Sequence, residues 1–217
     1  MLSAIPRISL IKKFGFNFKN KNCLDIGCSL GGFLYLAKRK GSNCCGVEPF
    51  EEYAKYASKY HDKNIYSGFI ENYDNNSEFD LISLFGVFQY FEDPDYVLKK
   101  IKSMMHSDSL LVIAGLPHVK KINFEDENTI QPYRAFLHSS KSIKILLERN
   151  GFEIQELYYS PEKLEKSFLE KLHILLLTSF DVLNYVIGLN KTLNNYFKKV
   201  EDINTVEGSL TIICSKK

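Results

Sequence analysis

Short apolar runs alternate with amphipathic segments along the first 160 residues of the chain. Five apolar runs predict strands at 22–26, 44–48, 64–68, 79–85 and 109–116. Apolar residues at helical spacing predict helices over 31–41, 51–60, 95–105 and 139–150. Gly41 is expected to cap the first of these helices, and the last has Ser139 or Ser140 as N-cap and Gly151 just past its end. Short buried strands separated by helices are typical of a parallel sheet covered on both faces.

The end of the chain departs from this alternation. A sixth strand at 152–159 is followed by a long helical stretch, 161–199, and then by a last strand at 209–216. We therefore predict one α/β domain over 1–217, with a doubly wound, Rossmann-like fold. Its mostly parallel seven-stranded sheet has an antiparallel last strand with a helical insertion before it. Residues 1–20 form an N-terminal extension.

Composition narrows the class of protein only a little. The 217 residues suffice for one α/β domain, and a net charge of +2 gives no indication of a nucleic-acid partner. Five cysteines without paired spacing indicate neither a disulfide framework nor a structural zinc site. The N-terminus lacks the features of a signal peptide, so we expect a cytoplasmic protein. The apolar stretch 172–189 is interrupted by polar residues, so we expect a helix over the sheet or acceptor pocket, with a dimer interface or a membrane-surface contact as alternatives.

The loop after the first strand is where a ligand of such a fold is expected, because ligands bind outside the carboxyl ends of parallel strands. It has the sequence Asp25-Ile26-Gly27-Cys28-Ser29-Leu30-Gly31-Gly32. Glycines there permit a tight turn and a close approach of backbone N–H groups to a ligand. The alternative is a glycine-rich turn that only packs the helix on the strand.

Two carboxylates strengthen the ligand interpretation. Glu48 ends the second strand, at the distance from the loop where an acidic residue accepts hydrogen bonds from ribose hydroxyls. Asp25 ends a buried strand, and a buried carboxylate needs a partner, such as a cationic amino-acid group or the loop amides. Ser29 stands where a dinucleotide-binding loop needs its middle glycine, which disfavours NAD without excluding it.

The segments CLDIGCSLGGFLYLAKRKG and CGVEP resemble motifs I and II of the class I S-adenosylmethionine (SAM)-dependent methyltransferases, of the small-molecule type. FDLISLFGVFQYFEDPDYVLKKI and HSSKSIKILLERNGFEI resemble later motifs of the same family. The resemblance implies SAM as cofactor and SAH as product. It implies cofactor-binding residues at Asp25, Gly27, Ser29 and Gly31 for the methionine part, Glu48 for the ribose, Phe69 and Ile70 beside the adenine, and the backbone around Phe85 and Gly86 beneath the sulfonium. Cys28, Pro49 and Gln89 are further cofactor-binding candidates.

Two departures from the family pattern bear on the chemistry. Phe69 replaces an aspartate that often bonds the adenine amino group, so stacking and backbone contacts would hold the adenine. Gln89 and Tyr90 replace a common Glu-His pair, which removes one familiar acid or base. His118, directly after the fifth strand, is then our candidate catalytic base. Tyr90 and three residues of the polar loop 117–138, namely Tyr133, Arg134 and His138, are candidate substrate-binding residues.

The sequence thus favours methyl transfer from SAM to a small molecule, through an oxygen of a sugar, glycan precursor or secondary metabolite. The alternatives are an NAD-dependent oxidoreductase and a catalytically silent SAM-binding module. We expect no metal, no nucleic-acid partner and no transmembrane segment, and leave a homodimer open. The acceptor itself is not indicated.

Overall fold

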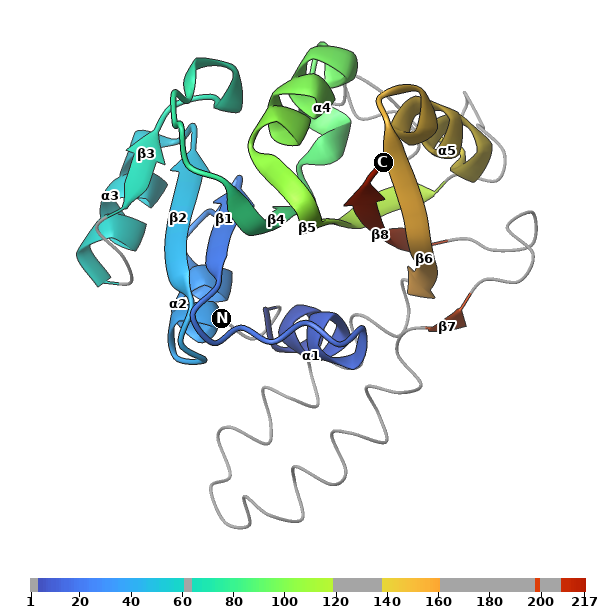
Figure 1. Cartoon of the computed structure of the whole chain (residues 1–217). Helices are drawn as coiled ribbons and strands as arrows, with labels where there is room; N and C mark the ends of the chain where they lie inside the picture. The colour runs from blue at the N-terminus through green and yellow to red at the C-terminus, as the bar shows by residue number, and fades with distance from the viewer. Residues whose placement is uncertain (1–3, 61–63, 119–137, 161–197, 200–207) are drawn as a thin grey trace.

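The computed structural model describes residues 4–60, 64–118, 138–160, 198–199 and 208–217. The strands are β1 Asn22–Ile26, β2 Asn43–Glu48, β3 Ile65–Ser67, β4 Phe79–Phe85, β5 Met105–His118, β6 Phe152–Ser160, β7 Lys198–Lys199 and β8 Gly208–Lys216. They form one sheet in the order β3-β2-β1-β4-β5-β8-β6-β7 (Figure 1). Strands β1 to β5 are parallel, whereas β8 is antiparallel to both β5 and β6. The predicted doubly wound sheet with an antiparallel last strand is confirmed, and the two-residue β7 extends its edge.

Helices cover both faces of this sheet (Figure 1). They are α1 Ala4–Lys13, α2 Gly32–Lys38, α3 Glu51–Tyr60, α4 Pro94–Ser103 and α5 Ser140–Arg149, with short 3-10 turns η1 Ile70–Asn72 and η2 Phe88–Tyr90. Successive strand residues point to opposite faces. In β4, Leu81 and Phe85 join the core under α1 and α2, whereas Ile82 and Leu84 join the core under α4 and α5. The alternation places a packed layer on each side of the central strands.

Local hydrogen bonds decide where the helices start. The Ser139 hydroxyl accepts the Ser142 N–H at 3.1 Å, so Ser139 is the N-cap of α5. Asp93 caps α4 in the same way, and Pro94 follows at the first helical position. Gly151, at φ +77°, turns the chain from α5 into β6, as predicted.

Three predicted boundaries are wrong. Helix α2 ends at Lys38, and Gly41 at φ +92° follows its C-cap, Arg39, because two tight turns close the chain before β2. Helix α4 ends at Ser103, since Met105 pairs with Phe79 and so opens β5. Residues 198–199 form β7, so the stretch predicted to be helical over 161–199 does not end as a helix. Residues 161–197 lie outside the described part of the chain.

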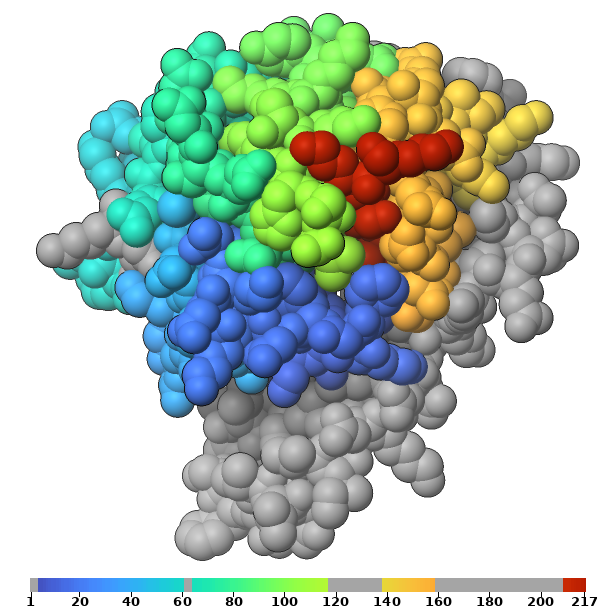
Figure 2. All heavy atoms as spheres, in the orientation of Figure 1, coloured from blue at the N-terminus to red at the C-terminus, as the bar shows by residue number. Residues whose placement is uncertain are grey.

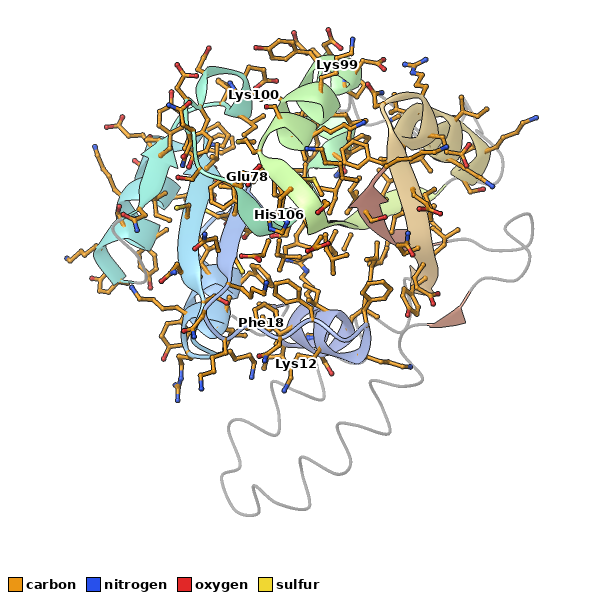
Figure 3. All side chains as sticks on the ribbon, in the orientation of Figure 1. Lys12, Phe18, Glu78, Lys99, Lys100 and His106 are labelled. Carbon is orange, nitrogen blue, oxygen red and sulfur yellow. The ribbon has the colours of Figure 1, made fainter. Side chains whose placement is uncertain are left out.

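The N-terminal extension contains a helix that we did not predict. Helix α1 buries one face, formed by Ala4, Pro6, Ile8, Leu10 and Ile11. In Figure 2 the N-terminal segment, in blue, forms a continuous band across the lower front of the molecule, and Figure 3 shows Lys12 and Phe18 on that side. Among the described residues, no helix is long and apolar enough to span a bilayer.

Candidate functional site

The loop between β1 and α2 is shaped by residues with positive φ. Gly27 has φ +71°, Ser29 +50° and Gly31 +77°. A Cβ at Gly27 would lie 2.3 Å from Val87 Cγ1, so only glycine fits beside the segment that follows β4. The N–H groups of Gly27 and Cys28 both donate to the Val47 carbonyl, at 2.7 and 3.1 Å. The loop is therefore fixed against β2, and the N-terminus of α2 faces the carboxyl edge of the sheet.

Glu48 connects this loop with the end of β2. Its side chain is 3% exposed; Oε2 accepts the Ser29 N–H at 2.7 Å, and Oε1 accepts the Phe50 N–H at 3.0 Å. Pro49, between Glu48 and Phe50, is exposed. The structure thus brings the predicted ribose carboxylate against the predicted methionine loop.

Asp25 ends up beside Glu48, as a buried carboxyl group at the end of β1. Its side chain is 3% exposed, and the Ser83 hydroxyl of β4 donates to its Oδ1 at 2.6 Å. The pKa of Asp25 is raised to about 7, mainly because the carboxyl group is buried; the Ser83 hydrogen bond and the charge of Arg7 lower it, and the charge of Glu48 adds a smaller upward effect. A cationic group that bound here would favour the ionised carboxylate.

Arg7 is a site residue that the sequence did not indicate. Helix α1 carries its guanidinium to 4.4 Å from the centre of the Phe85 ring at the end of β4. The Phe85 ring also packs edge-on against Phe33 of α2, with centroids 4.8 Å apart. A cation from α1 therefore lies near Asp25 at the carboxyl edge. The apolar spacing of Ala4, Ile8 and Ile11 was the available signal for this helix, but nothing in the spacing marked the arginine.

Aromatic side chains lie at the two predicted adenosine-binding segments. Phe69 is 62% exposed after β3, whereas Ile70 is buried in the core, so only the backbone of Ile70 can contact a ligand. Phe50 is 67% exposed directly after Pro49 and lies 5.7 Å from the Tyr53 ring, measured between centroids. We did not predict Phe50; its place two residues after Glu48 was the signal.

The end of β4 presents bare backbone. Gly86 has φ +74°, and a Cβ placed there would meet no atom within 4 Å. Its N–H donates to the Ala114 carbonyl of β5 at 2.7 Å, and Gly115 of β5 lies against the same residue. Gln89 is buried, and its Nε2 donates to the Gly86 carbonyl at 3.0 Å. Gly86 and Gln89 therefore lie together beyond β4, with β5 beside them.

The structure describes only three of the five residues predicted to act on or bind the methyl acceptor. His118 is the last residue of β5 and pairs with Gly208 of β8. Tyr90 is about half exposed at the end of η2. His138 is buried, with its ring 5.5 Å from that of Phe88, and burial lowers its pKa. Tyr133 and Arg134 lie outside the described residues.

The cysteines in the described chain are free thiols, and four of the five are buried. Burial raises the pKa of Cys28, in the glycine loop, so its thiol is neutral. No group of three or more potential ligand side chains in the described segments could hold a metal ion.

Comparison with known proteins gives the family. The model of a methyltransferase domain matches residues 3–157, most of the chain. The chain belongs to this methyltransferase family. The resemblance to class I SAM-dependent methyltransferases is thereby confirmed, and with it SAM as the cofactor expected of the family. Over 98 residues the methyltransferase is 28% identical to a probable (S)-tetrahydroprotoberberine N-methyltransferase 2 of Papaver bracteatum, an alignment that spans 42% of the chain and 27% of that relative.

Solved structures support the fold of this methyltransferase. Magnesium protoporphyrin IX methyltransferase from Synechocystis with bound SAH has a TM-score of 0.62 and 14% identity, covering 99% of this chain and 82% of that one. A SAM-dependent methyltransferase from Archaeoglobus fulgidus has a TM-score of 0.64 and 20% identity, covering 100% and 95%.

Proposed function

We propose that the protein transfers a methyl group from SAM to a small-molecule acceptor, with SAM lying along the carboxyl ends of β1, β2 and β4. The observation that carries this proposal is the convergence of Asp25, Glu48 and Arg7 at that edge. Two buried carboxylates and one cation match a ligand with an ammonium, a carboxylate and a ribose diol. An oxidoreductase gains no support, because Ser29 stands at φ +50° where a dinucleotide loop has its middle glycine.

The methionine part of SAM is assigned to the α1 side of the site. Arg7 offers a planar guanidinium that pairs well with a carboxylate. Asp25 is the partner for the ammonium, since an adjacent cation offsets the cost of ionising a buried carboxyl group. Of the loop amides from Gly27 to Gly31, the Leu30 N–H is assigned as the further donor, because the other four donate within the protein.

The adenosine part is assigned to the β2 side. Glu48 accepts hydrogen bonds from the ribose hydroxyls in addition to those from the Ser29 and Phe50 amides, because a carboxylate has about four acceptor positions. Phe50 and Phe69 offer exposed rings for stacking on the adenine.

Catalysis in this account is mainly alignment. SAM, when bound, supplies the methyl group and loses its sulfonium charge as the methyl leaves. The bare backbone of Gly86 lets the acceptor and the methyl group approach in line, and alignment of reactants is worth roughly 7–11 kcal/mol. His118 is our candidate for the group that takes the acceptor's proton, since it ends β5 at the same edge.

We further propose that the acceptor atom is an oxygen of a sugar, glycan precursor or secondary metabolite. A nitrogen acceptor is the second candidate, because the curated relative is named as an N-methyltransferase. We also propose that the protein is cytoplasmic and forms a single domain over 1–217.

Label transfer tests the proposed activity. We expect [methyl-14C]SAM and a panel of hydroxyl and amine compounds to give labelled product and an equal amount of SAH. Glu48→Gln should raise the KM for SAM about 5- to 100-fold, because the amide places an N–H group against a backbone N–H. The exposed α3 substitution Glu52→Gln should leave it unchanged. Binding of SAH without turnover on any panel member would favour the silent module.

A further inference from the structure

Gln89 contains a buried hydrogen-bond acceptor without a partner among the described residues. Its side chain is 4% exposed, Nε2 donates to the Gly86 carbonyl at 3.0 Å, and Oε1 has no hydrogen-bond partner in the described part of the chain. The orientation of the amide is chemically fixed, because only the nitrogen can face a carbonyl oxygen. A buried polar atom left unpaired destabilises the fold, so this oxygen needs an explanation.

The sheet order places this oxygen on the opposite side of β4 from the methionine site. Asp25 lies on β1 and bonds to Ser83 on the β1 side of β4. Gln89 belongs to η2, which packs against β5, and its amide lies beside Gly86, where Gly115 of β5 makes its close approach. The order β1-β4-β5 thus separates the Asp25 carboxyl group from the Gln89 amide, with the bare Gly86 backbone between them.

We infer that Gln89 Oε1 accepts a hydrogen bond from the O–H or N–H group of the methyl acceptor, and so selects acceptors that carry such a proton. This inference rests on the proposed function and moves Gln89 from the cofactor side of the site to the acceptor side. A neutral amide cannot take a proton, so Gln89 binds and orients the nucleophile while the proton leaves to another group. Tertiary amines and thioethers, which have no proton to donate, are then disfavoured, because they would leave the oxygen unpaired.

Sinefungin tests this assignment without knowledge of the acceptor. In this SAH analogue an amino-bearing carbon replaces the sulfur, so an ammonium projects where SAM carries its methyl group. If Gln89 Oε1 accepts a hydrogen bond from the methyl acceptor as inferred, it faces the methyl position, and the ammonium should donate to it. We expect Gln89→Leu to lower the preference for sinefungin over SAH by at least about tenfold, as for loss of a charge-assisted hydrogen bond. The affinity for SAH itself should change by less than about threefold.

Two further variants separate a ligand contact from a structural role. Gln89→Glu loses the donor to the Gly86 carbonyl but keeps the shape and an acceptor oxygen for the ammonium, so it should retain the sinefungin preference. Gln155→Leu makes the same chemical change on the exposed face of β6, where Gln155 bonds to Ser215, and should change neither affinity. If Gln89→Leu does not fold, Gln89→Asn is the substitute, because its side chain is one methylene shorter and its oxygen no longer reaches the same position. It should lose the preference for sinefungin over SAH in the same way.

Isothermal titration of the wild type and these variants decides the matter. Equal weakening of SAH and sinefungin by Gln89→Leu would assign Gln89 to support of the cofactor site, and no change in either would show that its oxygen faces no ligand; both results overturn the inference. A wild type that binds SAH with no preference for sinefungin also overturns it, whereas a wild type that binds neither ligand overturns the proposed function itself.

Discussion

Asp25 is a residue at which stability and ligand binding oppose each other. Its unfolded pKa is 3.8 and burial raises the folded value to about 7, so the folded state holds the proton more tightly. The contribution of Asp25 to stability is therefore fully present below pH 3.8 and is lost as the pH rises through 7. At neutral pH and above, the site keeps an unfavourable charge that a cationic ligand can offset.

Asp25→Asn should remove this pH dependence. Relative to the wild type, its free energy of unfolding should rise by about 2 to 3 kcal/mol between pH 5 and pH 8, since each pKa unit corresponds to about 1.4 kcal/mol. Urea unfolding at both pH values measures the difference, and the exposed Asp74→Asn should show none. The same variant should bind SAH at least about tenfold more weakly. If the difference in free energy of unfolding between Asp25→Asn and the wild type stayed the same from pH 5 to pH 8, the folded protein would not raise the pKa of Asp25.

Arg7 should contribute to affinity through the carboxylate of the cofactor. Arg7→Ala should weaken SAH binding about 10- to 100-fold, as expected for loss of a charge-assisted hydrogen bond. Lys12→Ala, at an exposed position of the same helix, is the matched control and should have no effect. Titration with 5′-methylthioadenosine, which lacks the amino-acid part, isolates the contact. Equal weakening of both ligands by Arg7→Ala would instead mean that the arginine only holds α1 in place.

The sequence predicted these residues unevenly. Asp25 and Glu48 could be predicted from the sequence because each lies at the end of a strand, and strand ends of a parallel sheet meet at one edge. Arg7 could not be predicted, since its position depends on how α1 packs across the sheet, which local spacing does not encode. Ile70 was expected beside the adenine, but its side chain completes the core instead.

At the scale of elements, the turn after β4 offers a controlled test of the bare backbone. Gly86 and Gly15 both have positive φ, +74° and +99°, and a Cβ at either would meet no atom within 4 Å. Gly86→Ala and Gly15→Ala should each lower the free energy of unfolding by about 1 kcal/mol through backbone strain alone. Only Gly86→Ala should also weaken the binding of SAM or slow methyl transfer, because in the proposed site its methyl group would lie over the reacting centre. Identical binding and turnover in the two variants would place the reaction elsewhere.

Element types were easier to predict than element ends. The strands β1 and β4 match their predicted bounds because alternating packing and flanking polar residues agree there. The ends of α2 and α4 did not match, since tight turns after Lys38 and pairing of Met105 with Phe79 override the helical period. The last residues of the predicted insertion pair with β6 as β7, a long-range contact without a local signal.

At the scale of the whole molecule, the doubly wound fold followed from the alternation of strands and helices, and the antiparallel β8 from its place after the insertion. The layer that α1 adds could not be predicted from this alternation, although α1 brings the Arg7 guanidinium to the carboxyl edge. In the proposed site the two buried carboxylates, Asp25 and Glu48, lie at the ends of β1 and β2, and the bare backbone of Gly86 lies between β4 and β5. The proposed single domain and the oxygen acceptor stay predictions.

Thermal unfolding with SAH tests the central claim most directly, because it asks whether this edge of the sheet binds the cofactor. SAH at 100 times its dissociation constant should add about 2.7 kcal/mol to the free energy of unfolding. For a chain of this length that raises Tm by roughly 5–10 °C, and NAD⁺ at the same concentration should leave Tm unchanged. An unchanged Tm at millimolar SAH, or an equal rise with NAD⁺, would contradict the account.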